Sequence, residues 1–142
     1  MKRLLLILVV ILGTITTYAI TPSFFYGKQY SGMVDLSNTQ FAKTKDLDMK
    51  LTIKFNKNSD SGILMLDMIP KTQKMADLLS FESKEKTNPR VQFKYKISDG
   101  NILILDNSTT PSIIYVGQEG KVLVIDDNPI LEGMSVVLEI EN

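Results

Sequence analysis

The amino-acid types that are missing limit the chemistry available to this chain. Its 142 residues include no histidine and no cysteine. Serine–histidine and cysteine–histidine nucleophile systems are therefore excluded, and so are the usual zinc and copper sites, which need imidazole or thiolate ligands. Carboxylates, hydroxyls, lysines and tyrosines remain, but they form no catalytic motif. We therefore expect a protein that is not an enzyme and that carries no cofactor and no metal.

Asp67 stands out among the carboxylates because it lies in the apolar segment Ile63–Ile69. In an extended chain it shares one face with Met65. If that face turns inward, the buried carboxylate has either a raised pKa or a cationic partner, and both are typical of ligand pockets. If the face turns outward, or if Asp67 ends a strand, the carboxylate is merely solvated.

Other acidic side chains suggest weaker alternatives. Asp126, Asp127 and Asn128 could offer oxygen atoms to Ca²⁺, but no EF-hand spacing accompanies them, and such residues before proline are ordinary in turns. The remaining candidate acid pairs are Asp46 with Asp48, and Glu132 with Glu139 and Glu141. Glycoside hydrolysis needs two carboxylates at a fixed separation across a cleft. A carboxylate-based hydrolase is therefore the least favoured interpretation.

Alternation of apolar and polar residues is the clearest structural signal. Apolar residues alternate with polar ones at Met49, Leu51, Ile53 and Phe55, and again at Val91, Phe93, Tyr95 and Ile97. Each segment is expected to be a strand with one buried and one solvent-facing side. Six further strands are expected near 28–36, 61–69, 101–106, 112–117, 121–126 and 133–141. Together they predict a mostly β, single antiparallel up-and-down barrel of about eight strands, with a β-sandwich as the alternative.

Two local signals refine this arrangement. Asp99-Gly100 between apolar runs indicates a two-residue hairpin, because a type I′ turn needs positive φ at both central positions. Such a turn pairs Ile97 with Ile102 and Tyr95 with Ile104. Between Thr72 and Glu82, apolar residues at helical spacing follow a residue suited to cap a helix. This stretch predicts one short helix.

Some of the expected strands are apolar on both faces, notably those at 63–69 and 122–125. Their outer face needs a cover, for which the candidates are the short helix, the aromatic segment at 24–26 or a partner chain. Phe24, Phe25, Tyr26 and Tyr30 form the densest aromatic cluster. We favour a plug over the outer strand surface; the alternatives are closure of a barrel mouth and docking onto another protein.

The first nineteen residues have the composition of a secretory signal. Met1-Lys2-Arg3 is positively charged, Leu4–Leu12 is wholly apolar, and Thr17 and Ala19 are small residues at the positions that signal peptidase reads. We expect residues 1–19 to be a cleaved signal peptide and residues 20–142 to be a single β-rich domain. The expected location is extracytoplasmic: secreted, periplasmic or at the cell surface. The alternative is an uncleaved N-terminal segment that tethers the domain to a membrane.

The charge balance excludes one class of partner. The chain has 16 basic and 16 acidic residues, and removal of Lys2 and Arg3 with the signal leaves 14 against 16, a net charge of −2. Nucleic-acid binding needs a clustered basic surface. We therefore expect no nucleic-acid partner.

The order of these features resembles small lipocalin-like domains of bacterial exported proteins. The resemblance rests on a strand such as LTIKF followed by a polar turn, a short helix, a hairpin such as FKYKISDGNILIL and a strand pair such as IIYVGQEGKVLVI. It covers about residues 28–141 and implies the fold of such domains. The aromatic residue that these domains commonly carry after a glycine on the first strand is absent, because Gly32 is followed by Met33.

Three classes of function follow, in decreasing order of preference. The first is an exported, non-enzymatic binding module that holds a small apolar ligand or a peptide in its interior. The second is a structural or interaction protein that contacts an envelope protein through exposed apolar strands, and the third is the hydrolase. For the first class the expected ligand-binding residues are Asp67, Met65, Phe93, Tyr95 and Tyr115.

Overall fold

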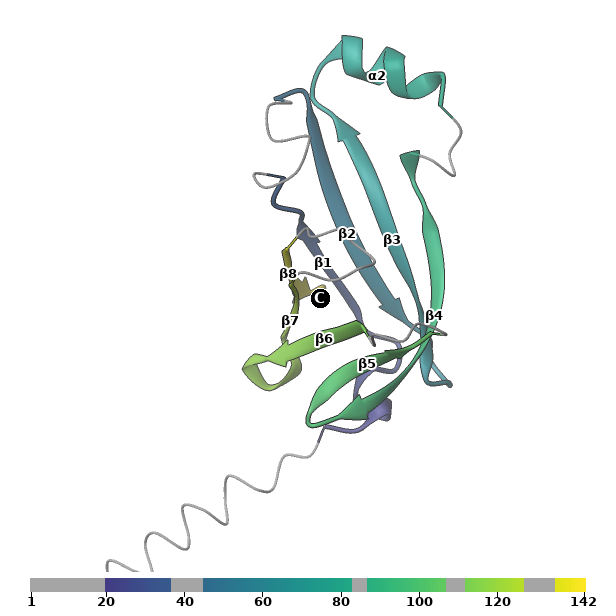
Figure 1. Cartoon of the computed structure of the whole chain (residues 1–142), viewed down its shortest axis with the longest axis vertical. Helices are drawn as coiled ribbons and strands as arrows, with labels where there is room; N and C mark the ends of the chain where they lie inside the picture. Colours follow the sequence, from purple (N-terminus) through teal and green to yellow (C-terminus); the bar gives the residue numbers. More distant parts are fainter. Residues whose placement is uncertain (1–19, 37–44, 83–86, 107–111, 127–134) are drawn as a thin grey trace, which may run out of the picture.

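The protein folds as a closed antiparallel β-barrel (Figure 1). The computed structural model describes residues 20–36, 45–82, 87–106, 112–126 and 135–142. Within these ranges the strands are β1 (Gln29–Met33), β2 (Leu47–Phe55), β3 (Ser61–Pro70), β4 (Arg90–Ser98), β5 (Asn101–Leu105), β6 (Ser112–Gly117), β7 (Val122–Ile125) and β8 (Val136–Ile140). Each strand pairs with the next in sequence, and β1 pairs with β8 to close the ring. The expected up-and-down barrel is confirmed, and the β-sandwich alternative is wrong.

Alternation of side-chain direction along the strands places one set of side chains inside the barrel. On β2, Met49, Leu51 and Ile53 are buried, whereas Lys54 is exposed. The inner faces of the other strands carry the rest of the buried core, which includes Tyr30, Leu64, Tyr95, Ile102, Ile114, Leu123, Ile125 and Leu138. This core forms one continuous cluster. In the absence of cysteine, apolar burial is therefore the main source of stability.

The β4–β5 hairpin forms as the sequence predicts. Ile97 lies opposite Ile102 and Tyr95 opposite Ile104. Asp99 and Gly100 have φ values of 51° and 77°, the combination that a type I′ turn requires. The turn therefore fixes the register, and the register places Tyr95 and Ile104 in the core.

One end of the barrel, here called the helix end, carries the helix α2 (Gln73–Ser80). At this end β2 and β3 extend well beyond the rest of the barrel, and α2 lies above their tips (Figure 1). The Thr72 hydroxyl accepts a hydrogen bond from the backbone N–H of Met75, 3.2 Å away, and so caps the helix as expected. The predicted helix is confirmed, with slightly shorter bounds. No helix in the described ranges is long and apolar enough to cross a membrane.

The opposite end, here called the plugged end, contains the turns that join β2 to β3, β4 to β5 and β6 to β7. A short 3₁₀ helix, η1 (Pro22–Phe25), precedes β1 there, and a second, η2 (Gln118–Gly120), forms most of the β6–β7 turn. The seam between β1 and β8 needs Gly32. A Cβ atom at that position would lie 2.1 Å from the backbone oxygen of Val137. The two strands could not approach so closely with any other residue at this position.

Candidate functional site

The plugged end is closed by aromatic side chains. Phe25 of η1 is fully buried, and its ring centroid lies 5.1 Å from that of Phe55 and 6.4 Å from that of Tyr95. These edge-to-face and tilted contacts are favourable arrangements for aromatic pairs. The expectation that the aromatic segment covers the outer strand surface is therefore wrong. Phe25 enters the barrel, because more apolar area is removed from water inside the barrel than on its convex surface.

Two tyrosine hydroxyls hold this closure in place. Tyr95 donates a hydrogen bond to the backbone carbonyl of Pro22, 3.0 Å away, and Tyr30 donates to the carbonyl of Gly120, 2.6 Å away. Burial raises the pKa of Tyr30 to about 12. It also raises the pKa of Tyr95, with a further contribution from the carboxylate of Asp60. Both phenols therefore stay neutral at ordinary pH and act as donors to the backbone rather than as acids.

The helix end is different, because inward-facing apolar side chains are accessible there. Val91 lies opposite Leu64 and shares the inner face of β4 with Phe93, yet it is 47% exposed. Across from it on β3, Leu66 and Met68 also face inward and are only half-buried. The cause is geometric. β5 ends at Leu105, opposite Lys94, so β4 has no described strand on its β5 side between Arg90 and Phe93.

Helix α2 adds apolar side chains above this opening. Met75 and Leu79 pack against the core cluster from one side of the helix. Leu78 is exposed, and Phe81 just after the helix is 87% exposed. The inner surface at this end is thus built from methionine, leucine and valine, whose flexible or rounded shapes suit an adaptable apolar site.

The structure divides the five expected ligand-binding residues among three locations. Phe93 and Tyr95 lie in the interior, below the accessible Val91. Met65 and Asp67 lie on the outer face of β3, because Leu64 and Leu66 between them face inward. Tyr115 lies on the outer face of β6, 47% exposed. Of the five, only Phe93 and Tyr95 therefore point into the barrel, with Phe93 next to Val91 on the inner face of β4 and Tyr95 in the plug.

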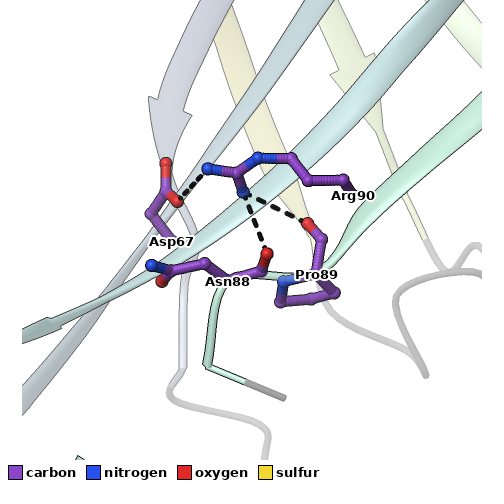
Figure 2. Close-up of polar contacts among 4 residues, drawn as sticks. All are labelled: Asp67, Asn88, Pro89 and Arg90. Atoms are coloured by element: carbon purple, nitrogen blue, oxygen red, sulfur yellow. Dashed lines mark hydrogen bonds and ion pairs between the residues drawn. The ribbon is translucent and has the colours of Figure 1, made fainter. Parts of the chain in front are cut away.

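Asp67 forms part of an outer polar contact (Figure 2). Its Oδ1 atom lies 3.0 Å from Nη2 of Arg90. Nη1 of the same guanidinium lies 3.3 Å from the backbone carbonyl oxygens of Asn88 and Pro89. Both ionic side chains are partly exposed, and the contact joins the start of β4 to the middle of β3. Asp67 therefore lies on the outer face of β3, which is the second of the two interpretations. Its cationic partner, Arg90, also lies outside the barrel.

Tyr115 belongs to a group of apolar side chains outside the barrel. Its neighbours follow from the strand register, in which Tyr115 lies opposite Val124 and Val124 lies opposite Val137. We call this group the outer belt; its members are Met33, Leu105, Ile113, Tyr115, Val124 and Val137. All are exposed except Val124, which is half-buried. Within this surface, the apolar pattern on both faces of residues 122–125 was the sequence signal.

A surface hollow of about 390 Å³ lies over β3, β4 and the end of β5. Its lining includes Ser61, Ile63, Gln92 and Lys94, whose side chains the register places on the outside, together with Gly62 and Phe93. The mixture is polar and open to solvent, without the convergent apolar walls of a typical ligand cavity. It therefore makes a weaker candidate than the helix end.

The other carboxylates that the sequence suggested as calcium ligands or acid pairs do not form a site in the described residues. Among the described residues, no three acidic side chains gather as metal ligands. Asp126 instead accepts a hydrogen bond from the Ser135 hydroxyl, 2.5 Å away. Glu141 is held by the Ser31 hydroxyl, Gln29 and Lys50, which lower the pKa of its carboxyl. Asp127, Asn128 and Glu132 lie outside the described residues.

Comparisons of this chain with protein-family models, with curated proteins and with solved structures find no match.

Proposed function

We propose that this protein is an exported, non-enzymatic binding module of the lipocalin-like type, which holds a small apolar ligand at the helix end of its barrel. The observation that carries the proposal is Val91, an inward-facing apolar side chain that remains 47% exposed. Exposed apolar surface on the inside of a barrel is shielded from other macromolecules and available to small ones. A barrel closed at one end and accessible at the other is the usual arrangement for such binding.

The interior supports this assignment in its chemistry. Leu66, Met68, Met75 and Leu79 offer apolar contact without charge. The plug of Phe25, Phe55 and Tyr95 forms a rigid floor below Phe93. Among the described residues the buried polar side chains are those of Thr52 and Ser112, and neither is charged. The preferred ligand is therefore neutral and apolar in the part that enters the barrel.

A pair of valine variants tests the proposal with a neutral apolar fluorescent probe, N-phenyl-1-naphthylamine. Val91→Lys places a charge on the inner face, and Val137→Lys places one on the outer face at a valine of similar exposure, 55%. We expect Val91→Lys to weaken probe binding at least tenfold and Val137→Lys to leave it within a factor of two. Equal effects of the two variants, or no binding of the probe to the parent protein, would contradict the proposal.

A second measurement detects a natural ligand, if one is bound. Native mass spectrometry of the protein purified from its own host should show a co-purifying molecule of a few hundred daltons. We expect that molecule to be lost from the Val91→Lys variant and retained by Val137→Lys. A parent protein that carries no such mass and also fails to bind the probe is not a carrier.

The outer belt favours a second candidate function, an interaction protein. Contiguous exposed apolar residues on a protein surface usually mark a docking site. This candidate uses a different face of the molecule from the helix end, so the two functions are compatible.

A further inference from the structure

Three methionine side chains lie at the helix end of the barrel. Met49 of β2 and Met68 of β3 are directly opposite each other, and both point into the barrel. Met75 of α2 is half-buried and packs against the same core cluster from above, where the helix lies over the tips of β2 and β3 (Figure 1). The helix contacts β3 and begins soon after it ends. Its first turn, which carries Met75, therefore lies next to the end of β3 that carries Met68.

The hydrogen-bond pattern between β2 and β3 brings the first two of these side chains close to each other. The backbone N–H of Lys71 donates to the carbonyl oxygen of Asp46, so these two residues form a hydrogen-bonded pair. Such pairs alternate with non-hydrogen-bonded pairs along an antiparallel ladder. Met49 and Met68 lie three positions further along, and they therefore form a non-hydrogen-bonded pair. In such a pair the Cα atoms are only about 4.5 Å apart, and the side chains are correspondingly close.

The thioether of methionine is the soft metal ligand that remains to a chain without histidine and cysteine. Soft sulfur ligands select Cu(I), whereas carboxylate and carbonyl oxygens suit Mg²⁺ and Ca²⁺. Asp48 and Asp67 are the carboxylates next to Met49 and Met68 in the sequence. Both lie on the outer face of the barrel, where they pair with Lys71 and Arg90. The inner face therefore presents sulfur, and no carboxylate from these neighbours, at this position.

We propose that Met49, Met68 and Met75 form a binding site for a Cu(I) ion. The methionine side chain has three rotatable bonds and a polarizable sulfur, so the three sulfurs can converge on one ion while the backbone stays in place. Met49 is 2% exposed and forms the closed side of the site. Met68 and Met75 are half-buried and leave a path for the ion to enter. A monovalent ion is also less costly to place among apolar side chains than a divalent one.

This site goes beyond the proposed carrier function and does not depend on it. The sulfur atoms hold the ion, whereas the apolar surface of the same side chains holds a neutral ligand. Substitution of methionine by leucine separates the two roles, because leucine lacks the sulfur but has a similar volume and apolar character.

A pair of leucine variants on one strand tests the site. Met68→Leu removes an inner sulfur, and Met65→Leu, on the outer face of the same strand, is the matched control. Competition with the chromophoric chelator bathocuproine disulfonate, under anaerobic conditions, measures the affinity for Cu(I). We expect the parent protein to bind the ion with a dissociation constant below about 1 μM. Met68→Leu should weaken binding at least about tenfold, Met75→Leu should do the same from the helix, and Met65→Leu should leave it within about a factor of two.

Nuclear magnetic resonance identifies the ligands directly. In protein isotopically labelled at the methionine methyl groups, Ag(I) serves as a soft ion that keeps its oxidation state. Its addition should shift the methyl signals of Met49, Met68 and Met75. The signals of Met33 and Met65, which lie outside the barrel, should stay in place. Zn²⁺ should shift none of these signals, because zinc sites use nitrogen, oxygen and thiolate ligands.

Three results would overturn the metal site. The parent protein could fail to compete with the chelator for Cu(I). Met68→Leu and Met65→Leu could weaken binding equally, which would assign it to sulfur atoms at the surface. Ag(I) could shift the signals of Met33 and Met65 alone. The naphthylamine probe keeps these failures distinct from failure of the carrier function, since Met68→Leu should bind the probe within about a factor of two of the parent protein.

Discussion

The hydroxyl of Tyr95 donates a hydrogen bond to the backbone carbonyl of Pro22 from a strand that lies far away in sequence. This contact fixes η1 across the plugged end and places the Phe25 ring between Tyr95 and Phe55. The N-terminal segment of the domain is thereby part of the core rather than an attachment to it.

The first prediction concerns the size of that contribution. Phe25→Ala should lower the free energy of unfolding by about 3–5 kcal/mol, because it leaves a cavity among packed aromatic rings. Phe81→Ala is the control, since Phe81 is 87% exposed, and it should change stability by less than about 0.5 kcal/mol. Urea unfolding of both variants measures the difference. A loss of under 1 kcal/mol for Phe25→Ala would mean that η1 is only loosely attached.

A pair of glycines separates steric from conformational effects. Gly120 and Gly100 have φ values of 86° and 77°, so alanine is strained at both positions. A Cβ at Gly120 would also lie 2.3 Å from Cε1 of Phe24, whereas Gly100 has nothing within 4 Å. We expect Gly100→Ala to cost about 1 kcal/mol and Gly120→Ala about 1–3 kcal/mol more. Similar losses for the two variants, measured by thermal unfolding, would show that Phe24 moves aside freely.

The buried phenol of Tyr30 predicts a loss of stability at high pH. Its pKa is raised to about 12 in the folded protein and is near the ordinary value of 10 in the unfolded chain. Between these two pH values the Tyr30 phenol loses its proton in the unfolded chain but keeps it in the folded protein. The contribution of the buried phenol to stability is therefore complete below pH 10 and is lost as the pH rises through 12. The shift corresponds to at most about 2–3 kcal/mol.

Tyr30→Phe provides the control for this effect. The variant lacks the hydrogen bond to Gly120 and should be about 1 kcal/mol less stable at pH 7. Its stability should fall less steeply between pH 10 and 12, because one titrating phenol is gone. Denaturant midpoints of both proteins, measured between pH 10 and 12, test this expectation. If stability falls with pH as steeply in Tyr30→Phe as in the parent protein, groups other than Tyr30 cause the loss of stability at high pH.

The contact between Asp67 and Arg90 predicts a small effect. Asp67→Asn should cost less than about 1 kcal/mol, because both ionic groups are partly exposed to solvent. It should leave binding of the naphthylamine probe unchanged, since Asp67 points away from the interior. A tenfold loss of probe binding in Asp67→Asn would restore this residue to the binding site.

The sequence predicts best those features that depend on neighbouring residues alone, such as strand alternation and turn conformation. The strands follow from alternation along segments such as Met49–Phe55, and the β4–β5 register follows from the turn at Asp99-Gly100. Side-chain direction was harder to predict. Ile63–Ile69 is apolar on both faces, so alternation could not show whether Asp67 points inward or outward.

Tertiary packing explains the remaining differences. Burial of Phe25 inside the barrel depends on the space left between Tyr30, Phe55 and Tyr95, which come from different strands. Exposure of Val91 depends on where β5 ends, a boundary that sequence patterns locate only approximately. Tyr115 was expected at a ligand site, but the register assigns it to the outside.

The seam between β1 and β8 has a consequence for how the protein reaches its folded state. Tyr30 finds its strand partner at Ile140, close to the other end of the domain. The barrel therefore cannot close until β8, the last of its strands in sequence, has been synthesised. Closure of the barrel must wait for β8, and such distant pairing makes folding slow. During that interval the apolar strands are unprotected, so we expect a holding chaperone to improve the yield of the folded protein.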